Sequence, residues 1–79
     1  MTQFEPYEVV ELLRRIEPRL SAYQIEAKPD EELWELHFER EGRSHRLKID
    51  RLYFETCLEG DCDHIRAIVK EVCDYLEGR

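Results

Sequence analysis

The feature that most constrains the fold is an alternation of apolar and polar residues on both sides of Glu41-Gly42. The apolar members are Trp34, Leu36 and Phe38 before this dipeptide, and Leu47 and Ile49 after it. A period of two is typical of a β-strand with one buried face, and a dipeptide ending in glycine suits a two-residue hairpin loop. The segment therefore predicts an antiparallel hairpin with an apolar inner face and a charged outer face.

The length of the hairpin loop sets which residues lie opposite each other. A two-residue loop places Trp34 opposite Ile49 on the inner face. A four-residue loop keeps the same faces but places Glu39 opposite Arg46 on the outer face. The sequence thus predicts the faces of the hairpin and leaves both registers open.

Two amphipathic helices are expected to flank the hairpin. Apolar residues at steps of three and four predict a helix over roughly residues 6 to 17, where Pro6 suits the first helical position and Pro18 prevents continuation. A second apolar stripe runs from Cys62 to Leu76 and predicts a C-terminal helix, with Asp61 as its N-cap.

The remaining segments favour further strands. Tyr23, Ile25 and Ala27 alternate with polar residues and predict a strand that ends where residues 28 to 32 break the pattern. We interpret residues 51 to 58 as a fourth strand, with an irregular segment as the alternative. The expected fold is α+β: a two-layer sandwich in which the N-terminal and C-terminal helices pack on one face of an antiparallel meander sheet of three to four strands.

Composition limits the function classes. A chain of 79 residues is expected to form a single small domain (1–79) with a modest core. A formal net charge of -7 argues against binding to nucleic acid or to an anionic membrane, and no apolar run is long enough to cross a bilayer. Three cysteines do not suit a paired disulfide framework. We expect a cytoplasmic protein with no cofactor.

The leading hypothesis is a small acidic protein-interaction module, of adaptor or inhibitor type, that binds a basic partner surface. Its working surface would be the open outer face of the sheet together with the acidic loop that follows the first strand. The residues assigned to this surface are Glu26, Asp30, Glu31, Glu32, Glu35, His37 and Glu39. The alternative without a binding function is that the outer carboxylates simply pair with basic residues of the same sheet.

Metal binding is one alternative function. Cys57, Cys62 and His64 could meet at the turn before the last helix. Cys73 lies eleven residues beyond Cys62, about 16 Å along a helix, and is expected in the core. Cys62 continues the apolar stripe, so a core thiol is favoured over a reactive one.

Nucleic-acid binding is the less favoured alternative. It would use the basic hairpin arm, which consists of Arg43, Arg46, Lys48 and Arg51. Catalysis is not expected, because no nucleophile has a plausible base in the required context. A homodimer formed through a sheet edge is left open.

The expected order of helix, three strands and helix resembles that of the double-stranded-RNA-binding domain. In that family, the resemblance implies a basic cluster at the start of the last helix. Here that position holds Asp61, Cys62, Asp63 and His64, which would repel phosphate. The frataxin-type fold is a looser resemblance, carried by Glu5, Glu8 and Glu11 with Trp34, although Arg14, Arg15 and Arg19 interrupt its acidic ridge.

Overall fold

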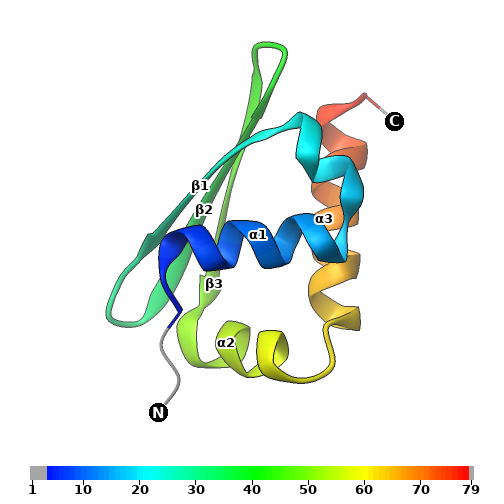
Figure 1. Cartoon of the computed structure of the whole chain (residues 1–79). Helices are drawn as coiled ribbons and strands as arrows, with labels where there is room; N and C mark the ends of the chain where they lie inside the picture. The colour runs from blue at the N-terminus through cyan, green and yellow to red at the C-terminus, as the bar shows by residue number, and fades with distance from the viewer. Residues whose placement is uncertain (1–3, 79) are drawn as a thin grey trace.

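The computed structural model describes residues 4–78 (Figure 1). Its elements are α1 (Pro6–Ile16), the 3-10 helix η1 (Pro18–Ala22), β1 (Gln24–Pro29), β2 (Leu33–Arg40), β3 (Arg43–Asp50), α2 (Arg51–Glu59) and α3 (Asp63–Leu76). The strands form one antiparallel sheet in the order β1-β2-β3, and the helices lie on one side of it. The predicted α+β class is confirmed, with three strands.

The β2–β3 hairpin has the register of a two-residue loop. Trp34 lies opposite Ile49, as that alternative predicted, and Arg40 lies opposite Arg43 next to the loop. Glu41 and Gly42 both have positive φ angles, 51° and 83°, as a type I′ turn requires. The four-residue alternative, which placed Glu39 opposite Arg46, is wrong because these torsions close the hairpin two residues after Arg40.

The interpretation of residues 51 to 58 as a strand is wrong, because they form α2. The Asp50 carboxylate accepts a hydrogen bond from the Tyr53 backbone N–H at 2.8 Å and caps the helix directly after β3. Phe54 and Leu58, four residues apart, are buried, whereas Leu52 is 78% exposed. Residues four apart lie on the same face in a strand and in a helix alike, so the spacing of Phe54 and Leu58 did not distinguish the two structures.

The helix α3 begins at Asp63, one residue later than a helix capped by Asp61 would begin. Its N-cap residue is Cys62, while the Asp61 carboxylate accepts a hydrogen bond from the Asp63 backbone N–H at 3.0 Å. The predicted N-cap at Asp61 is therefore wrong by one position. Because Cys62 precedes α3, it does not belong to the buried stripe of that helix. Cys62 is half-buried and lies outside the core cluster, so the expectation of a core thiol at this position is also wrong.

The core lies between the inner face of the sheet and the helices. Trp34, Leu36 and Phe38 of the central strand β2 are fully buried. They face the helix residues Val9 and Leu13 of α1 and Ile65, Val69 and Cys73 of α3, which are buried in the same cluster. Cys73 is thus a core residue, as predicted. No described helix covers the outer face of the sheet (Figure 1).

The buried Glu55 joins α2 to the central strand β2. Its Oε2 accepts hydrogen bonds from the indole N–H of Trp34 at 2.9 Å and from the guanidinium of Arg51 at 3.0 Å. The Arg51 guanidinium also lies 5.7 Å from the centre of the Trp34 ring. These contacts hold α2 against β2.

None of the helices within residues 4–78 has the length and apolar character that a bilayer crossing requires.

Candidate interaction surface

The outer face of the sheet consists of short rows of side chains that cross the three strands. Antiparallel pairing places one residue of β2 between a residue of β1 and a residue of β3 in every row. The rows are Lys28–Glu35–Lys48, Glu26–His37–Arg46 and Gln24–Glu39–Ser44. The structure therefore gathers Glu26, Glu35, His37 and Glu39 on one face, as the sequence predicted.

This face is of mixed charge rather than acidic. Two of its three rows contain basic residues from the edge strands, namely Lys28 and Lys48 beside Glu35 and Arg46 in the row of Glu26, whereas Glu39 lies between Gln24 and Ser44. Within residues 4–78, the only ion pair between members of these rows joins Lys28 Nζ to Glu26 Oε1 at 3.5 Å, and both side chains are well exposed. The carboxylates of Glu35 and Glu39 thus have basic or polar neighbours without a tight internal ion pair.

The acidic loop adjoins this face at the end where β1 turns into β2. Its exposed side chains are those of Asp30, Glu31 and Glu32. Arg51 fixes the backbone of the loop, since its guanidinium donates to the Asp30 carbonyl at 2.8 Å and its backbone N–H donates to the Glu32 carbonyl at 2.9 Å. The loop therefore presents the carboxylates of Glu31 and Glu32 from a defined position, which lowers the entropy cost of binding through them.

The basic hairpin residues are not gathered on one surface. Arg51 binds Glu55 and the acidic loop on the helix side of the sheet, and Arg43 Nη1 donates to the Leu76 carbonyl at 3.3 Å. Only Arg46 and Lys48 lie on the outer face, each in a row with other charged residues. Half of the candidate nucleic-acid residues are thus engaged within the protein.

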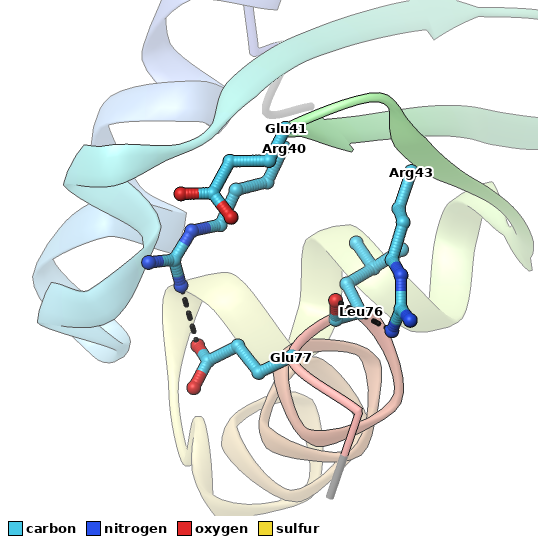
Figure 2. A pocket seen from close by; sticks show the side chains of 5 residues that line it. All are labelled: Arg40, Glu41, Arg43, Leu76 and Glu77. Carbon is cyan, nitrogen blue, oxygen red and sulfur yellow. Dashed lines mark hydrogen bonds and ion pairs between the residues drawn. The ribbon is translucent and has the colours of Figure 1, made fainter.

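A hollow of about 380 Å³ lies between the hairpin loop and the end of α3 (Figure 2). Arg40 and Arg43 line it, and both are occupied: Arg40 Nη1 lies 3.1 Å from Glu77 Oε2, and Arg43 binds the carbonyl of Leu76. A cation that binds the last carbonyls stabilises a helix C-terminus. This hollow is therefore a structural junction, in which both arginines neutralise groups of the protein itself.

The turn before α3 does not assemble the candidate metal ligands. The Cys62 thiol points to the Cys57 carbonyl, with an S–O distance of 3.3 Å, and His64 Nδ1 hydrogen-bonds to the Tyr53 hydroxyl. Desolvation raises the pKa of Tyr53, and a hydrogen bond to Cys57 raises it further. Across residues 4–78, no three or more His, Cys, Asp or Glu side chains are placed to hold a metal ion.

A groove between α1 and the outer edge of β1 was not anticipated from the sequence. It has a volume of about 400 Å³, and its apolar lining includes Tyr7 and Val10 of α1 and Ile25 and Ala27 of β1. The sequence contains a pattern that could have indicated it. Tyr7, Val10 and Arg14 are spaced by three and four residues and form a second row on the helix beside its main apolar stripe. Tyr7 is exposed and Val10 packs partly against the core, and both line the groove.

Comparison of the chain with models of protein families, with curated proteins and with solved structures gave no match. The functional assignment therefore rests on the residues of this chain and their arrangement.

Proposed function

We propose that the protein is a small interaction module that binds a basic partner protein through the outer face of its sheet and the acidic loop 30–32. The observation that carries this proposal is the one-sided packing of the fold: α1, α2 and α3 lie on the inner face, and no described helix covers the other (Figure 1). An antiparallel sheet with one open face offers a broad, rigid surface to a partner.

The arrangement of charge supports a partner with basic groups. The carboxylates of Glu31 and Glu32 extend from a loop that Arg51 fixes, and they are exposed. Glu35 and Glu39 follow on β2, about 13 Å apart along the strand. Because Lys28 and Lys48 flank Glu35, a partner would have to place its cations at defined points, so the mixed face favours selective recognition over general attraction of cations.

We place this module in the cytoplasm. Cys57, Cys62 and Cys73 are free thiols, and Cys57 and Cys62 are half-buried rather than sealed in the core. A reducing compartment keeps such thiols unpaired. An adaptor or inhibitor role fits the size of the chain, since a domain of 79 residues offers a surface more readily than an enclosed pocket.

The proposal is tested with three variants that each remove two carboxylate charges. The loop variant carries Glu31→Gln and Glu32→Gln, the face variant carries Glu35→Gln and Glu39→Gln, and the control carries Glu59→Gln and Glu71→Gln on helix surfaces. Each immobilised protein is exposed to a lysate of its own host, and captured proteins are quantified by mass spectrometry. The captured protein to be compared among the variants is a basic protein that the wild type retains.

We expect the loop and face variants to lose about 90% of that partner, corresponding to a loss of about 1.4 kcal/mol in binding free energy, while the control retains it. All four proteins should melt at similar temperatures, because the substituted side chains lie outside the core. Equal capture by all four proteins would refute the proposed surface, and so would capture that the control variant weakens as strongly as the others.

A further inference from the structure

We propose that the free edge of β1, beside α1, binds an extended basic segment of a partner protein, which joins the sheet as a fourth strand. This site shares only Glu26 with the outer-face surface, and the residues that test that surface, Glu31, Glu32, Glu35 and Glu39, take no part in it. Addition of a strand to an exposed edge is a recurring mode of peptide recognition, in which backbone hydrogen bonds give affinity and flanking pockets give selectivity.

The direction of the backbone groups in β1 follows from the neighbouring turn. The Asp30 N–H donates to the Leu33 carbonyl at 2.8 Å, so Leu33 and every second residue after it in β2 bond toward β1. Glu26, opposite His37, therefore bonds inward to β2. The N–H and C=O groups of Ile25 and Ala27 consequently point away from the sheet, toward the free edge.

The free edge of β1 is bounded on both sides. At its start, the Tyr23 carbonyl is already occupied by Arg14 Nη2 at 3.1 Å. At its end, Pro29 has no N–H to offer. Between these limits, no backbone hydrogen bond in the described part of the chain uses the outward groups of Ile25 or Ala27. An added strand would find two residues, Ile25 and Ala27 on either side of Glu26, whose backbone groups can each donate and accept.

The groove beside this edge would receive the side chains of that strand. Pro6, Tyr7 and Val10 form its α1 wall, and Ile25 and Ala27 form its floor. Tyr7 is 64% exposed, which leaves its ring free to cover an incoming apolar side chain. Since side chains alternate across a strand, every second residue of the bound segment would enter the groove and the others would lie beside the outer face.

Charge decides between a basic segment and a second copy of this chain. Glu11, Glu26 and Arg14 rim the groove, and the Arg14 guanidinium is held at the Tyr23 carbonyl, so the two carboxylates are the groups open to a partner. The Lys28 side chain that pairs with Glu26 is well exposed, and a partner cation can replace it at little cost. A two-fold pairing that joins Ile25 of each copy to Ala27 of the other would set Glu26 opposite its own copy, and like charges opposite each other are destabilising. Two chains of net charge -7 also repel. A lysine or arginine opposite Glu26 removes both costs.

The opposite edge of the sheet fits such a segment less well. Arg43 lies next to the two-residue loop, so Arg43 and every second residue after it in β3 bond to β2. The N–H and C=O groups of Ser44, Arg46 and Lys48 therefore point toward the free edge of β3. The cationic side chains of Arg46 and Lys48 flank that edge and would repel a basic strand.

The test is a titration of isotope-labelled wild-type protein with a short blocked peptide that alternates lysine and valine, followed by NMR. We expect the Ile25 and Ala27 amide resonances to shift and these amides to gain protection from hydrogen exchange. A peptide with glutamate in place of lysine should bind at least about tenfold more weakly. Shifts confined to Ser44, Arg46 and Lys48 would overturn the assignment, as would the absence of shifts at β1.

Two matched variants separate the edge from its surroundings. Ile25→Pro removes an N–H that points outward from β1, and Lys48→Pro removes the equivalent N–H from β3. We expect Ile25→Pro to weaken peptide binding by about tenfold or more and Lys48→Pro to leave it unchanged. Glu11→Lys, which touches no backbone group, should also weaken binding and provides the test if Ile25→Pro fails to fold. Concentration-dependent protection of Ile25 and Ala27 without peptide would identify a second copy as the occupant and refute the proposal.

Discussion

The Tyr23 hydroxyl donates a hydrogen bond of 2.7 Å to Glu77 Oε2, which joins the residue between η1 and β1 to the C-cap of α3 across 54 residues of sequence. The guanidinium of Arg40 lies 3.1 Å from the same oxygen and 5.4 Å from the centre of the Tyr23 ring. Arg19 approaches the other carboxylate oxygen of Glu77 at 3.5 Å. One carboxylate thus holds η1, the sheet and α3 together.

Replacement of Glu77 by alanine is expected to destabilise the protein by about 1–3 kcal/mol, because Tyr23 and Arg40 lose a charged acceptor in a poorly solvated place. Chemical denaturation measures this change. Glu71→Ala on the exposed side of α3 is the matched control and should change the stability by less than about 0.5 kcal/mol. Equal unfolding midpoints for the two variants would contradict the role given to Glu77.

Stability should fall in strongly alkaline solution. Burial raises the pKa of Tyr23 to about 12, and the hydrogen bond to Glu77 adds to this effect. The folded protein therefore holds this proton more tightly than the unfolded chain, whose tyrosine titrates near 10.0. The contribution is complete below about pH 10 and is lost between about pH 10 and pH 12. Burial also raises the pKa of the Cys73 thiol, which acts in the same direction.

Urea unfolding at about pH 9 and about pH 11 tests this dependence. Between these values the wild type should lose about 1 kcal/mol more stability than Tyr23→Phe, which lacks the titrating hydroxyl. Identical losses in the two proteins would show that Tyr23 is not responsible.

Glu55 offers a second test of a buried charge. Glu55→Ala leaves the Trp34 indole N–H without its acceptor and removes the carboxylate beside Arg51, so we expect a loss of about 2–4 kcal/mol. Glu55→Gln keeps an acceptor oxygen and should lose less. Thermal unfolding followed by circular dichroism ranks the two variants, and the opposite order would be inconsistent with the hydrogen bonds described.

The three thiols should react with an alkylating reagent in a fixed order. Cys57 and Cys62 are half-buried, whereas Cys73 is fully buried and burial raises its pKa, which disfavours the reactive thiolate. Mass spectrometry of the native protein should show label on the first two residues and none on Cys73 until denaturant is added. Early labelling of Cys73 would place it outside the core.

The existence and the two faces of the hairpin could be predicted because their determinants are local, whereas the sequence left two registers open. The alternation around Trp34 and Leu47 fixes the faces, and a positive φ at Gly42 suits the only glycine available there. Helix α2 could not be distinguished in the same way, since Phe54 and Leu58 fit either period. The deciding group was Asp50, whose cap depends on where β3 ends.

The candidate surface shows a similar division. The outward positions of Glu35 and Glu39 followed from the alternation alone, and the structure places them as predicted. The two-residue register, one of the two that the sequence left open, places Lys48 opposite Glu35. The position of Lys28 beside Glu35 depends on the register between β1 and β2, which the sequence did not specify. The groove beside Tyr7 depends on the angle at which α1 crosses the sheet, and no local pattern encodes that angle.

The junction at Asp50 and Arg51 has a consequence for how this chain can vary in length. Asp50 is the last residue of β3 and also the N-cap of α2, while Arg51 opens that helix and holds the acidic loop. One inserted residue would separate the cap from its helix and rotate Arg51 away from Asp30. Chains that share this fold should therefore keep the length of the chain fixed at this junction.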